Sequence, residues 1–119
     1  MSYWFLMYLK MKYLMKQFEV YIANLDPTKG TEINKTRPVV IVSPDEMNGA
    51  LRTVIIAPIT SQVHANIPTR IKFSLQDKIS YVVLDQLRTL DKTRLYKHIA
   101  NLTENDCESI KNTLIEMFS

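Results

Sequence analysis

The chain has 119 residues, of which 46% are hydrophobic and 23% are charged, and its formal net charge is +3. These values are typical of one globular domain and exclude an intrinsically disordered chain. The single cysteine, Cys107, excludes an internal disulfide, and a chain whose only glycines are Gly30 and Gly49 has no glycine-rich phosphate loop. Histidine and cysteine do not occur at zinc-site spacing, so no metal ion or other cofactor is expected.

Residues 1–14 form an apolar leader that is shorter than the ~18–20 residues needed to span a bilayer. The leader also lacks the basic start and the small-residue cleavage site of a secretory signal. We expect the native start to be Met11 or Met15, the leader to carry no function, and a single domain to occupy residues 15–119. The alternative is a short helix that packs on the protein or lies on a membrane surface.

After the leader, the chain follows the pattern of short strands. In residues 18–25, Phe18, Val20 and Ile22 recur at every second position, which predicts a half-buried strand with these side chains on one face. The β-branched run Val39–Val42 predicts a strand that is covered on both faces. A third strand is expected over 53–59.

Pro58 marks the end of that third strand as an edge or a bulge, because proline cannot donate to a sheet ladder. The further expected elements are a helical turn at 45–47, a strand at 71–75, a turn at 76–78, a strand at 81–87, a helical turn capped by Asp91, and a strand at 95–102.

A capping-box pattern at 103–106 predicts the start of a C-terminal helix. The apolar residues that follow at helical spacing are Cys107, Ile110, Leu114, Met117 and Phe118. We expect Cys107 to be a buried small hydrophobe on this face. Strands about ten residues apart with one terminal helix predict a mainly β (α+β) fold, a small and strongly bent β-barrel.

The loop 26–38 is polar, basic and rich in turn residues, and it lies between two apolar runs. It carries Glu32, Lys35, Thr36 and Arg37 just before a strand, which suits chemistry on an anion. The alternative is a solvated hairpin loop whose charges only keep it in water.

Three segments resemble the signatures of one family, the MazF/PemK toxin endoribonucleases. The first runs from Asp26 to Glu32 and continues from Arg37 to Ser43; the second is Ala57–Ser61; the third is Val83–Lys92. They occur in the family's order and separation, and the resemblance covers about residues 16–118.

This resemblance implies an SH3-like barrel of the CcdB/MazF type with a C-terminal α-helix, working as a cytoplasmic homodimer. It also implies metal-free, sequence-specific cleavage of single-stranded RNA, without a membrane partner. A MazE-like antitoxin with an acidic, disordered tail would hold the toxin inactive.

Cleavage by the neighbouring 2′-hydroxyl needs a base, an acid for the leaving 5′-oxygen and donors for the phosphate oxygens. By the resemblance, Arg37 and Thr60 supply the donors and Glu32 is the candidate base. The alternative for Glu32 is an ion pair with Lys35 or Arg37. One branch of the family uses a histidine at position 31 and an arginine at position 83, and this chain has neither.

Further polar residues are expected to contact RNA phosphates or base edges. They are Lys29, Thr31, Lys35, Thr36, Ser61, Gln62, Asp85, Gln86 and Arg88. Asp85 either hydrogen-bonds a loop or reads a base, and Gln86 and Thr89 are alternatively buried framework. His64 and His98 are expected in ordinary surface roles, or for His98 in a phosphate contact.

Two other classes of function stay open. A gyrase-poisoning toxin like CcdB shares the barrel, but that family depends on a tryptophan near the C-terminus, and the only tryptophan here is Trp4. A non-catalytic barrel that binds nucleic acid or a peptide would leave Arg37 and Thr60 as simple contacts.

Overall fold

The computed structural model describes residues 2–3, 14–25, 36–63 and 66–119. The predictions for most of the leader and for the loop 26–35 therefore lie outside the described residues. The elements, in chain order, are β1 (Glu19–Asn24), β2 (Thr36–Ile41), α2 (Asp45–Ala50), β3 (Thr53–Thr60), β4 (Arg70–Leu75), β5 (Lys78–Val83), the 3-10 helix η1 (Leu84–Gln86), β6 (Arg88–Asp91), the 3-10 helix η2 (Lys92–Arg94), β7 (Leu95–Asn101) and α3 (Glu104–Met117).

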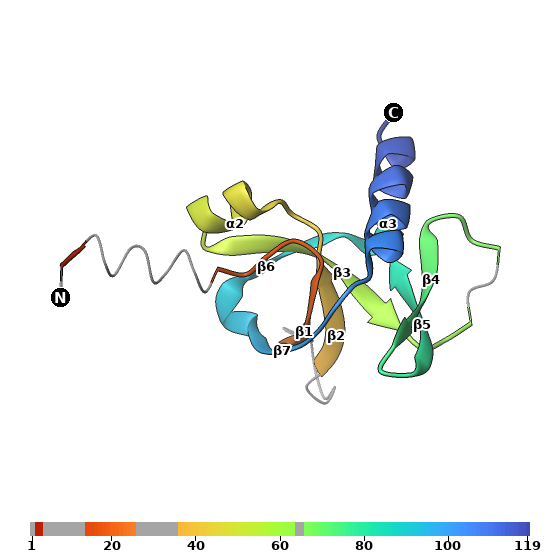
Figure 1. Ribbon diagram of the computed structural model, residues 1–119, viewed down its shortest axis with the longest axis horizontal. Helices are drawn as coiled ribbons and strands as arrows, with labels where there is room; N and C mark the ends of the chain where they lie inside the picture. Colours follow the sequence, from red (N-terminus) through yellow and green to blue (C-terminus); the bar gives the residue numbers. More distant parts are fainter. Residues whose placement is uncertain (1, 4–13, 26–35, 64–65) are drawn as a thin grey trace, which may run out of the picture.

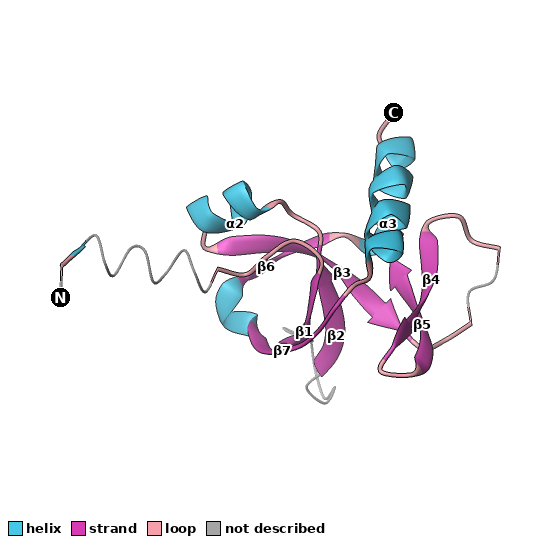
Figure 2. Ribbon diagram, in the orientation of Figure 1, coloured by secondary structure: helices cyan, strands magenta, loops and turns pink. Residues whose placement is uncertain are grey.

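Within the described residues the strands form one curled antiparallel sheet in the order β4-β5-β3-β2-β1-β7, and β6 pairs separately with β3 (Figure 1). The helices α2 and α3 lie outside this sheet, and strands make up most of the regular structure (Figure 2). The predicted class, a mainly β fold with a strongly bent sheet and a C-terminal helix, is confirmed.

The central strand is β3, which changes partner along its length. Residues 53–56 pair with β6, and Ile59 and Thr60 pair with β5, while β2 lies on the other side. Pro58 falls where the strand passes from one partner to the other, opposite Val39 of β2. The expectation that Pro58 marks an edge was therefore wrong, because β3 is a central strand. Proline has no N–H to donate, and Pro58 lies between the residues paired with β6 and those paired with β5.

Residues 39–41 of β2 are buried on both faces of the strand, as the β-branched run predicted, whereas Thr36 and Arg37 at its start are exposed. Val40 belongs to one apolar core, together with Phe18, Ile59, Phe73, Leu84 and Ile110 among others. Val39 and Ile41 belong to a second core, together with Ala23, Val54, Ile56, Leu90 and Leu95. Successive side chains of a strand point to opposite faces, so β2 separates the two cores.

The expected alternation in β1 was wrong. Val20 and Ala23 are fully buried, whereas Ile22 is only half-buried. The pairing of β1 with β7 shifts register between Val20 and Tyr21 and again between Ile22 and Ala23. The additional residues at these shifts, Ile99 and Tyr96, belong to β7, and β1 keeps a continuous register with β2. Val20 lies in the first core and Ala23 in the second, so β1 has apolar neighbours on both faces and not on one.

The strand expected over 81–87 ends at Val83. Leu84 is fully buried and begins η1, after which the chain pairs with β3 as β6. Strand β6 was not predicted, because only Leu90 of its four residues is buried and it has no alternating pattern to recognise.

The predicted turns and caps are present. Leu75 pairs with Lys78 across a two-residue turn, and the Asp91 side chain accepts a hydrogen bond from the Thr93 N–H at the start of η2. Helix α3 begins after Thr103, whose hydroxyl accepts from the Asp106 N–H at 3.2 Å. Ile110 is fully buried, whereas Phe118, expected on the same apolar face, is 74% exposed.

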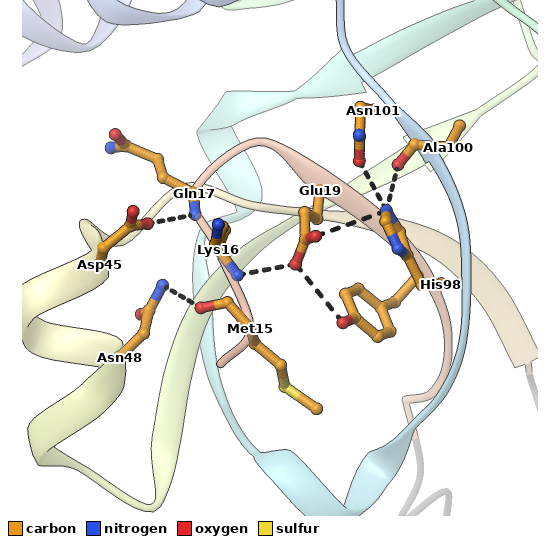
Figure 3. Close-up of polar contacts among 10 residues, drawn as sticks. Met15, Lys16, Gln17, Glu19, Asp45, Asn48, His98, Ala100 and Asn101 are labelled. Carbon is orange, nitrogen blue, oxygen red and sulfur yellow. Dashed lines mark hydrogen bonds and ion pairs between the residues drawn. The ribbon is translucent and has the colours of Figure 1, made fainter. Parts of the chain in front are cut away.

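A polar network attaches the segment before β1 to α2 and β7 (Figure 3). The Gln17 N–H donates to Asp45 at 2.8 Å, and the buried Asn48 side chain donates to the Met15 carbonyl at 3.1 Å. On the other side, His98 stacks on Tyr21 with ring centroids 5.2 Å apart. Residues 15 and 17 are thus held to α2, and the Lys16 N–H donates to the Glu19 carboxylate of β1 at 2.7 Å. No helix in the described part of the chain is long and apolar enough to cross a bilayer.

Candidate active site

Arg37 and Thr60 lie on neighbouring strand ends. Arg37 is the second residue of β2 and Thr60 the last residue of β3. The two strands are antiparallel with Val39 opposite Pro58, so the same register carried two residues further sets Arg37 opposite Thr60. The structure therefore brings together the two residues that the sequence singled out first.

Two hollows open beside this pair. The first, with a volume of about 330 Å³, extends toward the β4–β5 hairpin and is lined also by Gln76, Lys78 and Ser80. The second, of about 180 Å³, extends toward Arg70, Val83 and Gln86. Arg37, Ile59, Thr60 and Gln62 line both. The lining residues include three cations and no carboxylate, so the hollows favour an anion.

The polar groups at the centre of the site are available as donors. Within the described residues, the Arg37 guanidinium has neither a hydrogen-bond nor an ion-pair partner, and its side chain is exposed. The Thr60 hydroxyl accepts a hydrogen bond from the Gln62 N–H at 3.2 Å. Because this bond uses an oxygen lone pair, the hydroxyl proton stays available to a ligand.

Asp85 is held by the start of β4. Its carboxylate accepts from Arg70 through Nε at 3.2 Å and through a terminal guanidinium nitrogen at 3.3 Å, and from the Thr69 hydroxyl at 2.9 Å. The hydrogen bond from Arg70, followed by that from Thr69, keeps the pKa of Asp85 below its usual value despite an opposing effect of burial. Asp85 thus hydrogen-bonds the chain beside the second hollow, which was one of its two predicted roles.

The other predicted contacts divide into three groups. Ser61, Gln62 and Gln86 line one or both hollows. Thr36 and Arg88 are exposed but are not among the lining residues. Lys29, Thr31, Glu32 and Lys35 lie outside the described residues, as does His64.

Three alternatives can be compared directly with the structure. Gln86 and Thr89 are exposed, so the buried-framework alternative was wrong for both. His98 lies in β7 against Tyr21 and within 3.6 Å of Glu19, and it lines neither hollow. Cys107 is half-buried against the core, and burial raises the pKa of its thiol, in agreement with a packing role.

Sequence reasoning missed Arg70, Gln76, Lys78 and Ser80, which all line the hollows. They lie on the β4–β5 hairpin, which was predicted as strands and a turn without a role in the site. Their position depends on the pairing of β5 with the end of β3, which no local pattern indicates. Among the described residues, histidine, cysteine and carboxylate side chains do not gather in a group of three that could bind a metal ion.

Comparisons with known proteins agree with this arrangement. A family model described as a PemK-like, MazF-like toxin of type II toxin–antitoxin systems matches residues 16–118. The endoribonuclease MazF of Staphylococcus saprophyticus is 38% identical over 107 residues, which cover 85% of this chain and 88% of the relative.

Solved structures show the same fold. The toxin MazF-mt6 of Mycobacterium tuberculosis superposes with a TM-score of 0.69 at 25% identity, covering 84% of this chain and 95% of its own. MazF of Deinococcus radiodurans gives 0.70 at 24% identity, covering 89% and 97%. A mycobacterial endoribonuclease in complex with its cognate antitoxin gives 0.72 at 24% identity, covering 87% and 94%.

The family match and the staphylococcal relative together define the class of protein: the chain belongs to the PemK/MazF family of toxins of type II toxin–antitoxin systems. The resemblance drawn from the three sequence motifs is thereby confirmed.

Proposed function

We propose that this MazF-type endoribonuclease toxin cleaves single-stranded RNA at a specific sequence, without a metal ion, by attack of the 2′-hydroxyl on the adjoining phosphate. The observation that carries the proposal is the placement of Arg37 and Thr60 at adjacent strand ends, lining the same two hollows. The family match and the staphylococcal endoribonuclease support the class of reaction.

In this reaction the 2′-oxygen forms a bond to phosphorus and the bond from phosphorus to the 5′-oxygen breaks. A base removes the 2′-hydroxyl proton, and a proton is delivered to the leaving 5′-oxygen. The products are a 2′,3′-cyclic phosphate and a 5′-hydroxyl. We assign the base to Glu32 by resemblance to the family.

The transition state carries additional negative charge on the non-bridging phosphate oxygens. The planar, positively charged guanidinium of Arg37 matches two such oxygens. The Thr60 hydroxyl, which already accepts from the Gln62 N–H, donates its proton to the same phosphate. Donors that are fixed before the charge develops stabilise a transition state more than a ground state.

The direct test is incubation of the purified protein with a mixed-sequence RNA in EDTA, followed by sequencing of the RNA ends. We expect cleavage at defined sites, with 5′-hydroxyl ends that a polynucleotide kinase labels without prior dephosphorylation. An oligonucleotide with a 2′-deoxyribose at the cleaved position should be inert. Ends that carry a 5′-phosphate, or cleavage of the deoxy substrate, would contradict the mechanism.

Arg37→Ala should lower the cleavage rate by about 10²–10³ without changing thermal stability. Arg52→Ala is the matched control, because Arg52 is exposed and lines neither hollow. An equal loss in both variants would show that only the overall charge matters. A protein that binds RNA without cutting it, or inhibits gyrase, would instead support one of the two alternative classes.

We further propose that the toxin is a cytoplasmic homodimer neutralised by a MazE-like antitoxin. Structures similar to this chain include a mycobacterial endoribonuclease with its cognate antitoxin and a MazE–MazF complex from Deinococcus radiodurans. Light scattering on the purified protein, alone and with the antitoxin, should give the mass of a dimer and then of a larger complex. Cleavage should stop when the antitoxin is added.

A further inference from the structure

The larger hollow joins the proposed cleavage site to the β4–β5 hairpin. Arg37 and Thr60 line it from the strand ends, and Gln76, Lys78 and Ser80 line it from the hairpin. Its volume of about 330 Å³ lies at the lower end of the range of about 300–1,000 Å³ typical of ligand pockets. We call this hollow the hairpin pocket.

Two cations line the hairpin pocket, Arg37 from β2 and Lys78 from β5. Within the described residues, the Lys78 ammonium has neither an ion-pair nor a hydrogen-bond partner, and the lining includes no carboxylate. The rest of the lining combines apolar side chains, such as Ile59 and Leu75, with hydroxyl and amide groups, such as Ser80 and Gln76. Apolar surface suits the face of a base, and amides suit its hydrogen-bonding edge.

The turn that carries Gln76 is unusual. Leu75 and Lys78 are paired across it, and both central residues have a left-handed backbone, with φ of 49° at Gln76 and 66° at Asp77. Glycine and asparagine adopt this conformation at lower cost, and two-residue hairpin turns strongly prefer them. A glutamine at this position keeps a long amide side chain beside the pocket at a cost in backbone strain, which is a feature of functional sites.

We propose that the hairpin pocket holds the nucleotide next to the cleaved linkage, with its second phosphate on Lys78 and its base edge on Gln76. This inference rests on the proposed ribonuclease function and extends it to substrate selection. The scissile phosphate lies at Arg37 and Thr60, and the neighbouring phosphate lies at Lys78. An ammonium neutralises a phosphate as a point charge without fixing its geometry, whereas an amide can discriminate between bases.

The test uses a short oligonucleotide that contains the cleavage site mapped for the wild-type protein, with one ribose at the cleaved position and deoxyribose elsewhere. In two further substrates an uncharged methylphosphonate replaces the phosphate immediately before or immediately after the cleaved linkage. Wild type, Lys78→Ala and the control Lys72→Ala are compared by kcat/KM. Lys72 is an exposed lysine of the same hairpin that does not line the pocket.

We expect Lys78→Ala to lower kcat/KM about tenfold on the fully charged substrate, the size expected for loss of one charge-assisted contact. With the wild-type protein, kcat/KM on one of the two methylphosphonate substrates should be lower than on the fully charged substrate by a similar factor. On that same substrate, Lys78→Ala should lower kcat/KM no further. The salt dependence of log KM should flatten by about 0.7, the value for one phosphate of a single strand. Lys72→Ala should match wild type in kcat/KM on the charged substrate, in kcat/KM on both methylphosphonate substrates and in the salt dependence of KM.

Gln76 is tested with Gln76→Gly, which suits the left-handed backbone and removes the amide. The melting temperature should stay the same or rise, while the preference for one base at the neighbouring position weakens. Unchanged base preference would overturn the role of Gln76. Equal losses in Lys78→Ala and Lys72→Ala, or an undiminished effect of Lys78→Ala on both methylphosphonate substrates, would overturn the role of Lys78. A wild-type protein that does not cleave RNA at all would instead refute the proposed function itself.

Discussion

Two nitrogens of the Arg70 guanidinium donate hydrogen bonds to the carboxylate of Asp85, at 3.2 and 3.3 Å. Arg70 lines the smaller hollow together with Arg37 and Thr60. We infer that Asp85 is a positioning residue that holds Arg70 in one orientation toward the substrate. Asp85→Asn should lower kcat/KM by up to about fivefold, because a partly exposed ion pair is worth at most about 1 kcal/mol.

A double-mutant cycle separates the two predicted roles of Asp85. In an Arg70→Ala background, Asp85→Asn should cause no further loss of kcat/KM if Asp85 acts through Arg70. Additive losses would mean that Asp85 contacts the RNA itself.

The Arg70–Asp85 pair also makes a pH-dependent contribution to stability. The folded pKa of Asp85 is lowered, so this contribution is complete above the unfolded pKa and is lost as the pH falls through the folded value. The free energy of unfolding, measured by urea denaturation between pH 3 and 7, should therefore fall less steeply on acidification for Asp85→Asn than for wild type. Parallel curves would contradict this assignment.

Thr60 is expected to act through its hydroxyl and not through its shape. Thr60→Val removes the proposed donor to the phosphate and the acceptor for the Gln62 N–H, and should lower the single-turnover rate by about 10²–10³. Thr60→Ser keeps both functions and should retain most of the activity. An equally inactive serine variant would show that the methyl group is what the site requires.

Asn48 of α2 is fully buried and is bonded both to Met15, as Figure 3 shows, and to Ser43. Its side chain accepts from the Ser43 hydroxyl at 2.5 Å and donates to the carbonyls of Met15 and Ser43 at 3.1 and 3.0 Å. Asn48→Ala leaves these buried groups unpaired and should lower the free energy of unfolding by about 2–4 kcal/mol in urea denaturation. The exposed Asn112→Ala should change it by less than about 0.5 kcal/mol.

Tyr21 should remain un-ionised to an unusually high pH. Burial, the negative charge of Glu19 and the hydrogen bond to that carboxylate raise the pKa of Tyr21 to about 12. Because the folded pKa exceeds the unfolded value near 10, the contribution of Tyr21 to stability is complete below pH 10 and is lost between about pH 10 and 12. As the pH rises above 10, the free energy of unfolding should thus fall less steeply for Tyr21→Phe than for wild type. In an ultraviolet titration, Tyr21→Phe should lack the tyrosine ionisation that occurs at the highest pH.

The elements that could be predicted from sequence are those specified by neighbouring residues. The alternation in 70–75, the turn at Gln76 and Asp77 and the cap at Thr103 all depend on local chemistry, and all are present. Strand β6 and the burial of Ala23 on the second face of β1 depend instead on which elements lie alongside, so periodicity could not reveal them. Pro58 looked like the end of a strand because its neighbours in space were unknown.

The candidate site shows the same division. Arg37 and Thr60 were found through motifs, and their proximity follows from the pairing of β2 with β3. Lys78 and Arg70 escaped notice because they reach the site only when the β4–β5 hairpin pairs with the far end of β3. In the sequence alone, a charged residue of an alternating strand looks the same whether it lines a site or lies on an ordinary solvent-exposed face.

Because residues 39–41 of β2 are buried on both faces, the contrast between an apolar and a polar face does not fix the register of this strand. A slip by one residue normally exposes apolar side chains, but here it would exchange one apolar set for another. The alignment is instead fixed just after β2. There the Ile55 N–H donates to the Ser43 hydroxyl at 3.0 Å, and the Val42 N–H donates to the Ile55 carbonyl at 2.9 Å. Arg37 lies six residues before Ser43, about 20 Å along an extended chain. The register that sets the proposed catalytic guanidinium opposite Thr60 is therefore fixed by hydrogen bonds far from the candidate site.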